Sequence, residues 1–300
     1  MNPTSGAGNG PKILEDVLPI FLNANHKVTV NLTKRKGDAR ELAASLNLTG
    51  IAGIISIGGD GTFSEVLNGL LSDRPDGKEV AIGIIPAGCG NAIAHEMWGT
   101  DNAVDIAYQL IKRPLVKKTF PKIRYMDKDR EAIYYLCCYF TSGFIPNAIE
   151  RAEEWRWAGS FRYHIGFSAE MLLSEETNPS AQIVVDSTLV ADGPITLFLG
   201  GRNFSLDPST KSPPKPNSMT FVVFDPSVTG LAIFENIGKL LTGEGKIEDG
   251  GVKLFEGQVC DIRGGRREGV SVDGEVGIVN STPIRVEANG ATVMVFGTRN

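Results

Sequence analysis

A single carboxylate, Asp60, stands among the glycines of the stretch IISIGGDGT, between an apolar run and a helical pattern. A second stretch, IGIIPAGCGN, has the same design and places Gly88, Cys89 and Gly90 between a buried run and a helical pattern. Such a loop exposes backbone N–H groups at the start of a helix, where the helix dipole favours an anion. Glycine also lets the backbone approach a phosphate closely. Both stretches therefore predict phosphate binding.

A third glycine-rich loop, NPTSGAGNG, opens the chain at residues 2–10 and leads into a helical pattern. Ligands of parallel α/β sheets bind at the carboxyl edge of the strands, so three loops at one edge suggest a polyphosphate. Each loop alone is also compatible with a plain tight connection. Thr62 and Glu65 also fit a helix capping box, and Asn91 fits a helix N-cap. The chain has no G-x-x-x-x-G-K-[ST] motif, and GAGNG does not match G-x-G-x-x-G.

The first third of the chain alternates between helical and strand patterns. Asp38 is placed to cap a helix that runs to Leu46. Alternation predicts a strand over 26–32, and apolar runs predict buried strands over 51–57 and 81–85. Further helices are predicted over 11–23, 62–72 and 91–98. Strands that alternate with helices indicate a parallel sheet with helices on both faces.

The pattern changes near Pro114. Strands are predicted over 116–125 and 132–141 around the hairpin signal MDKDR, followed by a helical stretch over 147–175. Short strands follow over 182–185, 195–199 and 219–224 and again after residue 252, with a Pro- and Ser-rich loop over 205–218. We therefore predict an α/β protein: a Rossmann-like nucleotide domain with a parallel sheet over 1–114, then a mostly antiparallel β-sandwich lipid-binding domain over 115–300.

Composition narrows the class of protein. The net charge of −5 argues against a general nucleic-acid binder. Cys89, Cys137, Cys138 and Cys260 lack the spacing of a disulfide framework or a zinc site, which indicates free thiols in a reducing compartment. No apolar run reaches the roughly 18 residues of a membrane span, and no leader pattern opens the chain. We expect a cytoplasmic protein with transient peripheral membrane contact, and the oligomeric state stays open.

Several motifs together resemble those of the diacylglycerol kinase catalytic domain superfamily. GGDGTFSEVLNGL followed by IPAGCGNAIA carries the resemblance, and the GNA ending is similar to the sphingosine and ceramide kinase branch, particularly long-chain-base kinases. TKRKGDAREL (33–42) is similar to that branch's second nucleotide motif, and residues 143–166 resemble its lipid-recognition segment. VDGE (272–275) matches its C-terminal signature. The family has an apolar strand just before its Asn-Pro, so we expect a sheet without that first strand here.

The resemblance implies a lipid kinase of sphingolipid metabolism. In the family the residue that matches Asp60 is the base that takes the proton of the lipid's primary hydroxyl, which then attacks the γ-phosphate of ATP. Glu65 would orient the phosphates or a metal-bound water, while Asp273, Gly274 and Glu275 would complete the site, the two carboxylates through Mg²⁺. Arg156 and Arg162 would point at the phosphates. The other residues that would contact nucleotide are Asn2, Pro3, Thr4, Thr33, Lys34, Arg35, Lys36, Gly37, Gly58, Gly59, Gly61, Gly88, Cys89 and Gly90.

The lipid side departs from the family. Phe161, Phe167 and Met171 would form a wall of an acyl-chain pocket, although such a helical stripe is equally typical of plain core. Sphingosine kinases carry an acid where this chain has Ile149, and Asn147 replaces a nearby acid. Isoleucine cannot pair with an ammonium, whereas Asn147 can bond a hydroxyl or an amide. We therefore expect weak use of a free sphingoid base and acceptance of a neutral lipid alcohol.

Three alternatives stay open at this point. The first is a ceramide or diacylglycerol kinase. The second is a catalytically inactive lipid- or nucleotide-binding homologue. The third is an NAD kinase, which shares the GGDG turn, although the PAGCGNA loop and the two arginines argue against it. Cys89 also replaces a common serine of the family, which removes one good hydrogen-bond donor beside the nucleotide.

Overall fold

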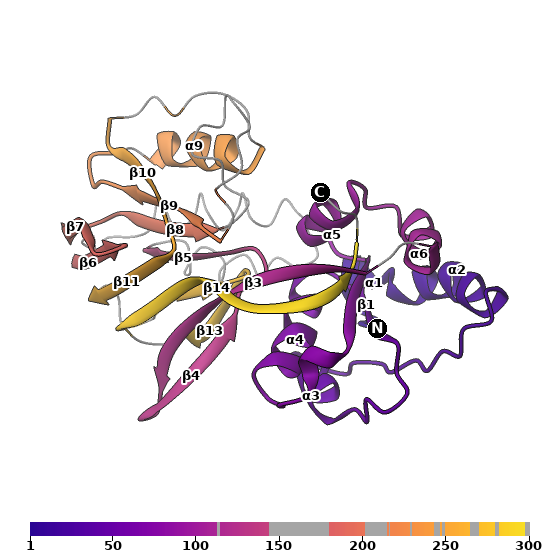
Figure 1. The fold of residues 1–300 in the computed structure, drawn as a ribbon. Helices are drawn as coiled ribbons and strands as arrows, with labels where there is room; N and C mark the ends of the chain where they lie inside the picture. Colours follow the sequence, from indigo (N-terminus) through magenta and orange to yellow (C-terminus); the bar gives the residue numbers. More distant parts are fainter. Residues whose placement is uncertain are drawn as a thin grey trace. The chain divides into compact units, whose positions relative to one another are not determined.

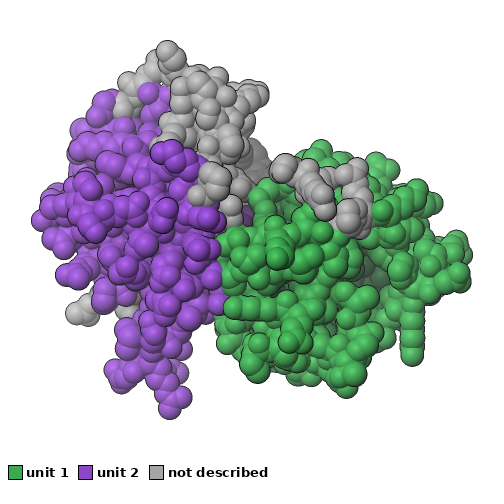
Figure 2. Space-filling model, in the orientation of Figure 1, with its two compact units in different colours: residues 1–120, 291–300 green, residues 121–290 purple. Residues whose placement is uncertain are grey.

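The computed structural model describes residues 1–112, 115–143, 180–201, 215, 217–228, 230–242, 247, 250–264, 270–279 and 282–297. The chain forms two compact units (Figure 2). Unit 1 consists of residues 1–120 and 291–300, and unit 2 consists of residues 121–290. The helical stretch predicted over 147–175 lies outside the described residues, as does most of the loop predicted over 205–218.

Unit 1 is built on parallel strands (Figure 1). Strands β1 (Gly53–Gly58) and β2 (Ala81–Pro86) pair in parallel with Ile54 opposite Ile82, and the end of β14 (Ile284–Phe296) lies parallel to β2. The helices of this unit are α1 (Ser5–Gly8), α2 (Gly10–Asn23), α3 (Asp38–Ser45), α4 (Asp60–Leu71), η1 (Gly77–Glu79), α5 (Ala92–Trp98) and α6 (Ala103–Lys112). The parallel α/β architecture predicted for this part is confirmed.

The helices of unit 1 pack in pairs against the strands. Helix α2 packs on α6 and α3 on α4, and α2, α4, α5 and α6 all contact the parallel strands. Helix α4 is the most deeply placed, with Phe63 and Leu67 fully buried and Leu70 nearly so. Burying side chains of this size supplies most of the driving force for folding, so α4 is a rigid base for the residues at its N-terminal end.

The strand predicted over 26–32 is wrong. Residues 25–34 form no helix or strand, and Val28, Val30 and Leu32 are exposed. Hydrogen bonds reach this segment and β1 through the first two residues: Thr33 N–H donates to Met1 O (3.0 Å) and Asn2 N–H donates to Ile57 O (2.9 Å). An alternating pattern makes a strand when its backbone groups find ladder partners along their length. In the described part of the chain residues 26–32 form no ladder, although Asn31 O accepts a hydrogen bond from the Met1 amino group (2.7 Å).

Unit 2 is a sandwich of two sheets that share one core (Figure 1). The first sheet contains β14, β11, β6 and β7, with β3 and β4 beside β14; the second has the order β10-β9-β8-β5-β12-β13. The strands are β3 (Leu115–Asp127), β4 (Arg130–Tyr135), β5 (Tyr139–Gly143), β6 (Ser180–Val185), β7 (Thr188–Pro194), β8 (Leu197–Gly201), β9 (Met219–Phe224), β10 (Val252–Gly257), β11 (Val259–Gly264), β12 (Val270–Val272) and β13 (Glu275–Val279). The mostly antiparallel β architecture predicted here is confirmed.

The strand predicted over 132–141 is in fact two strands. Strand β4 pairs with β3 in the first sheet, whereas β5 pairs with β8 and β12 in the second. The chain crosses between the sheets at residues 136–138, which an apolar run does not reveal because both strands are buried. The predicted hairpin at MDKDR is confirmed: Lys128 and Asp129 both have positive φ, as a two-residue hairpin turn requires.

The second sheet buries both of its faces. One face contributes Phe140, Phe198, Phe221 and Val272 to the core between the sheets. The other, which we call the outer face, carries Leu197, Leu199, Val222 and Phe224 and packs against α9 (Gly230–Thr242) through Ile233 and Leu240. Tyr139 of β5 also packs on this outer cluster.

Candidate active site

The three glycine loops of unit 1 meet at the carboxyl ends of β1 and β2. A Cβ atom on Gly88 would lie 2.6 Å from Gly59 Cα, so the turn after β1 and the turn after β2 touch through their backbones. A Cβ on Gly6, in the loop of residues 2–10, would lie 2.3 Å from Ala87 O. Side chains at these positions would separate the loops. The glycines therefore provide close approach, and Gly6 in addition has a positive φ of 56°.

Asp60 lies where two of these loops meet. It is the first residue of α4, and its two carboxylate oxygens accept hydrogen bonds from Ala92 N–H (3.1 Å) and Ile93 N–H (2.9 Å) at the start of α5. The anion at this helix N-terminus is thus supplied by the protein itself. Each carboxylate oxygen keeps lone-pair capacity beyond one hydrogen bond, so the group can also accept a proton.

Glu65, on the next turn of α4, does the same for α3. Its carboxylate accepts hydrogen bonds from Gly37 N–H (2.8 Å) and Ala39 N–H (3.1 Å). The alternative that Thr62 and Glu65 form a capping box for α4 is wrong, because α4 begins at Asp60 and Thr62 already lies inside it. Glu65 therefore holds the end of the Thr33–Gly37 segment that is predicted to contact nucleotide.

Asp38 also serves that segment rather than the helix it was expected to cap. Its Oδ2 accepts hydrogen bonds from Lys34 N–H (2.7 Å) and Arg35 N–H (3.1 Å), and Gly37 occupies the N-cap position of α3. These bonds, first of all the one from Lys34 N–H, lower the pKa of the Asp38 carboxyl below its ordinary value. Lys34, Arg35 and Lys36 are exposed, so this loop presents three basic side chains to solvent.

Asn91 closes the glycine loop that follows β2, a role that sequence reasoning missed. Its Oδ1 accepts from Gly88 N–H (3.0 Å), and its Nδ2 donates to Gly88 O (3.2 Å). It does occupy the N-cap position of α5, as expected, but its side chain makes no cap bond and its φ is +50°. The signal was available, since asparagine is among the few non-glycine residues that adopt positive φ readily. Cys89, inside the loop that Asn91 closes, is an exposed free thiol.

Asn2 joins the loop of residues 2–10 to α4. Its Nδ2 donates to Thr62 Oγ1 (3.2 Å), and its Oδ1 accepts from the backbone N–H (3.1 Å) and hydroxyl (3.0 Å) of Thr4. Thr62 was considered as a cap and is instead the partner of Asn2. The predicted nucleotide residues of unit 1 are therefore gathered at one end of β1 and β2.

The predicted metal residues lie in unit 2, at the turn between β12 and β13. Asp273 accepts hydrogen bonds from Cys137 N–H and Cys138 N–H, the shortest at 2.7 Å, and from the Tyr134 hydroxyl (3.3 Å). Its own N–H donates to Tyr139 O (2.8 Å), and Glu275 is partly exposed two residues later. Mg²⁺ at nucleotide sites commonly takes one or two carboxylates together with phosphate oxygens and waters, so the anchored Asp273 carboxylate, with Glu275 two residues later, fits it. In the described ranges, no cluster of three or more ligating side chains forms a complete metal cage.

Several predicted site residues lie outside the described part of the chain. They are Asn147, Ile149, Arg156, Phe161, Arg162, Phe167 and Met171. Their roles stay predictions.

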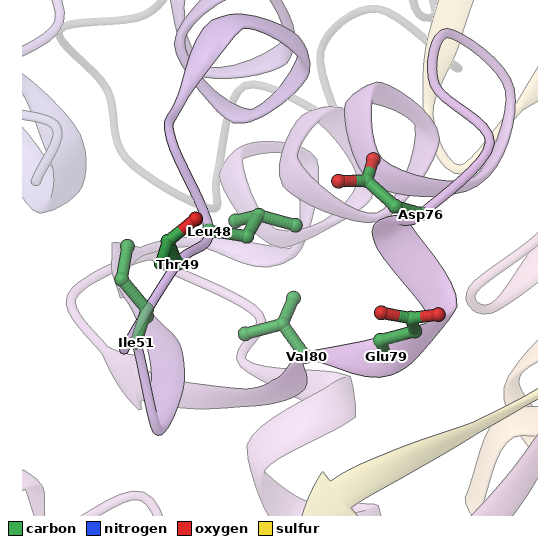
Figure 3. A pocket seen from close by; sticks show the side chains of 6 residues that line it. All are labelled: Leu48, Thr49, Ile51, Asp76, Glu79 and Val80. Atoms are coloured by element: carbon green, nitrogen blue, oxygen red, sulfur yellow. The ribbon is translucent and has the colours of Figure 1, made fainter.

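A hollow of about 220 Å³ lies at the opposite ends of the parallel strands, just before β1 and β2. Figure 3 shows Thr49 and Ile51 on one side and Asp76 and Glu79 on the other, with the side chains of Leu48 and Val80 between them. Asp76 is paired with Arg74 (2.7 Å). The glycine loops, which lie at the carboxyl ends of β1 and β2, do not line this hollow, so we assign it no part in the site.

Comparisons with known proteins show which proteins this chain resembles. Residues 1–119 match the family model of the diacylglycerol kinase catalytic domain. The chain is 31% identical over 193 residues to sphingoid long chain base kinase 4 of Schizosaccharomyces pombe, covering 63% of this chain and 41% of that protein. It is 29% identical over 178 residues to human ceramide kinase, covering 54% of this chain and 33% of that one. The predicted resemblance is confirmed.

The fold is also shared with solved structures. A diacylglycerol kinase from Bacillus anthracis str. Sterne aligns with a TM-score of 0.69 and 22% identity, covering 99% of this chain and 95% of that chain. The aligned parts of the two curated relatives above span less than half of their own length. No helix among the described residues is long and apolar enough to cross a membrane.

Proposed function

We propose that this chain is an ATP-dependent lipid kinase that transfers the γ-phosphate of ATP to a primary hydroxyl of a lipid. One observation carries the proposal. The Asp60 carboxylate lies between two glycine loops that touch through Gly59 and Gly88, in a region that matches a lipid kinase catalytic domain. The relatives named above act on sphingoid bases and ceramide, which supports a lipid as acceptor.

Asp60 is the general base of the proposed reaction. The lipid hydroxyl gives its proton to an Asp60 oxygen as its own oxygen forms a bond to the γ-phosphorus, and the bond from that phosphorus to the β,γ-bridging oxygen breaks, releasing ADP. The hydrogen bonds from Ala92 and Ile93 hold the carboxylate in place before substrate binds. Positioning and charge neutralisation, more than covalent chemistry, drive phosphoryl transfer.

The loops supply nucleotide contacts. The exposed Lys34, Arg35 and Lys36, in a segment fixed by Glu65 and Asp38, attract the anionic nucleotide, and loop N–H groups around Cys89 and Gly90 face its phosphates. Mg²⁺, when bound by Asp273 and Glu275 together with the phosphates, would neutralise their charge.

The finer proposal concerns the lipid. Because Ile149 stands where sphingosine kinases have an acid, a neutral alcohol such as a ceramide or a diacylglycerol is accepted at least as well as free sphingosine. A radiolabelled phosphate assay with Mg-ATP tests both levels, using sphingosine, ceramide, diacylglycerol and NAD in parallel, with Asp60→Asn as the inactive control.

Three results of that assay distinguish a lipid kinase from an NAD kinase and test the proposed lipid. Label in any lipid that Asp60→Asn fails to produce supports the lipid kinase. Label in NAD with none in lipid replaces it with an NAD kinase. A strong preference of the unaltered protein for sphingosine would overturn only the proposal about the lipid. Ile149→Asp would then leave that preference unchanged.

A further inference from the structure

Asn91 belongs to a closed ring of contacts that also contains the proposed base, Asp60. Its side chain bonds Gly88 twice, as acceptor from the N–H (3.0 Å) and as donor to the carbonyl oxygen (3.2 Å). Gly88 in turn lies against Gly59, the residue before Asp60, since a Cβ on Gly88 would be 2.6 Å from Gly59 Cα. The ring closes through helix α5, because Ala92 N–H, directly after Asn91, donates to Asp60 Oδ2 (3.1 Å). One set of contacts therefore holds both the glycine loop after β2 and the base.

The backbone of Asn91 has the conformation that this ring needs. It lies in the left-handed region (φ 50°, ψ 32°), which turns the chain from the glycine loop into α5. Its carbonyl oxygen accepts the N–H of His95 (3.0 Å), the first hydrogen bond of that helix. Asparagine adopts positive φ at low cost, and its short amide side chain can bond nearby backbone groups. Asn91 thus serves the loop with its side chain and the helix with its backbone.

The hydrogen bonds of the ring decide which loop donors remain for a phosphate. The N–H of Gly88 donates to Asn91, and the two N–H groups that start α5 donate to Asp60. The N–H groups of Cys89 and Gly90 make no hydrogen bond with another described residue. The segment that Asn91 closes therefore keeps two neighbouring donors for a ligand.

We propose that Asn91 is a positioning residue of the kinase, which aligns the Cys89 and Gly90 N–H groups with the Asp60 carboxylate. The inference rests on the proposed function and assigns a residue to the alignment of the nucleotide loop with the base. Phosphoryl transfer depends on both at once, because the γ-phosphate and the attacking hydroxyl must be held in line. Asn91 is 8% exposed and bonds Gly88 through both polar atoms of its amide, so it acts through the loop.

Asn102 offers a matched control at the start of another helix of unit 1. Its Oδ1 accepts hydrogen bonds from Val104 N–H (3.0 Å) and Asp105 N–H (3.1 Å) in the first turn of α6. Asn102→Gly therefore removes two side-chain hydrogen bonds at a helix start, as Asn91→Gly does. Asn102 belongs to none of the glycine loops, so its loss should affect stability alone.

The first test separates the side chain of Asn91 from its backbone. Asn91→Gly keeps the left-handed backbone accessible and removes both bonds to Gly88, whereas Asn91→Ala also disfavours that backbone. Mg-ATP binding is measured by calorimetry, turnover by steady-state kinetics, and Tm on the same samples. We expect Asn91→Gly to raise the Kd for Mg-ATP about five- to tenfold and to lower kcat about tenfold, with larger effects in Asn91→Ala. Asn102→Gly should lower Tm by a similar amount and leave Kd and kcat unchanged.

A double substitution tests whether Asn91 acts on turnover through Asp60. In the Asp60→Asn background the base is gone, so Asn91→Gly should lower the remaining kcat much less than it does in the unaltered protein. The Kd for Mg-ATP should still rise, because the loop is disturbed in both backgrounds. An equal fall of kcat in the two backgrounds would overturn the alignment with the base.

Other results would also overturn the inference. One is an Asn91→Gly variant with unchanged Kd and kcat, and another is an equal change of both in Asn102→Gly, which would leave Asn91 a purely structural role. Lipid labelling that Asn91→Gly leaves unaltered would keep the lipid kinase and overturn only the inference. Labelling of no lipid, with a Kd for Mg-ATP that depends on Asn91 and not on Asn102, would overturn the kinase and keep Asn91 as the positioning residue of the loop. An unaltered protein that binds no Mg-ATP would overturn both.

Discussion

The glycine loops of unit 1 and the outer face of unit 2 treat their polar groups in opposite ways. In the loops, the side chains with chemical capacity are bonded within the chain: Asp60 to α5, Glu65 to α3 and Asn91 to Gly88. On the outer face, Thr141 and Ser271 are buried with no such bond among the described residues. The difference shows that the first region fixes its polar side chains through bonds within the chain, whereas the second buries two hydroxyls that have no partner among the described residues.

Helix α4 is the source of that organisation in unit 1. Its buried residues Phe63 and Leu67 hold it against the strands, while Asp60 and Glu65 reach the starts of two other helices. A carboxylate at a helix N-terminus is stabilised by the exposed N–H groups and the dipole. The same two carboxylates thus fix the loops on either side of the proposed nucleotide site.

The largest expected effect comes from Asp60→Asn. The amide keeps the size of the side chain but cannot take the hydroxyl proton, so kcat should fall by about 10²- to 10⁴-fold. Asparagine can also accept only one of the two N–H bonds, because its NH₂ group would face the other donor. Steady-state kinetics with calorimetric ATP binding check this. Retained ATP binding with lost turnover places the effect on the chemical step, and an unchanged kcat would remove Asp60 from the role of base.

The contact between the loops is tested by Gly88→Ala with Gly90→Ala as its control. A methyl group at 88 would lie 2.6 Å from Gly59 Cα and 3.1 Å from Asn91 Oδ1, so backbone must move. At 90 the new methyl would lie 3.4 Å from Asp60 Oδ2, an ordinary contact. We expect Gly88→Ala to lower the free energy of unfolding by about 1–3 kcal/mol and raise the KM for ATP about tenfold. Gly90→Ala should leave the free energy of unfolding unchanged, because its new methyl makes an ordinary contact, and an equal loss of stability at both positions would refute the close-approach argument.

The comparison also shows what the sequence could reveal. The elements of unit 1 follow from local periodicity, and the loops follow from glycine spacing, so their existence was predictable. The partners of Asp60 and Glu65 were not, because both bonds join residues about 30 positions apart. A T-x-x-E pattern looks the same whether Glu65 caps its own helix or another one. Tertiary packing places the Glu65 carboxylate at the start of α3, so it caps that helix.

Unit 2 was harder to predict for a related reason. Strands β4 and β5 form one apolar run in the sequence but belong to different sheets. The strand expected over 26–32 failed in the opposite way: its residues alternate, but among the described residues they form no ladder, and the backbone bond there joins Asn31 O to the Met1 amino group. The open hydroxyls of Thr141 and Ser271 could not be inferred at all, because serine and threonine in strands are usually bonded or exposed.

A smaller effect is expected from Glu65→Gln. Glutamine keeps one acceptor for Gly37 N–H or Ala39 N–H and turns a donor toward the other, so one bond and the charge at the start of α3 are lost. We expect a loss of about 1 kcal/mol in the free energy of unfolding and a modest rise in the KM for ATP, with kcat nearly unchanged. Chemical denaturation and kinetics check this. A kcat loss as large as that of Asp60→Asn would instead mean that Glu65 acts on the phosphates directly.

The smallest effect concerns the pH dependence that Asp38 gives to the neighbouring loop. The carboxylate accepts the N–H groups of Lys34 and Arg35 and pairs with the Arg35 guanidinium at 3.2 Å, and its pKa is lowered in the folded protein. A group whose pKa is lower when folded adds stability that is present above its unfolded pKa, about 4, and is lost as pH falls through the folded value. The Tm difference between the unaltered protein and Asp38→Asn should therefore be small, constant from about pH 5 to pH 8, and should shrink below about pH 4.

Asparagine can still accept both N–H groups through its single oxygen, so what it loses is the charge facing Arg35. Raising the salt concentration should reduce the same difference at neutral pH, because the Arg35 side chain is exposed and salt screens its charge. A difference that persists unchanged at low pH and in high salt would show that Asp38 holds the loop through shape alone.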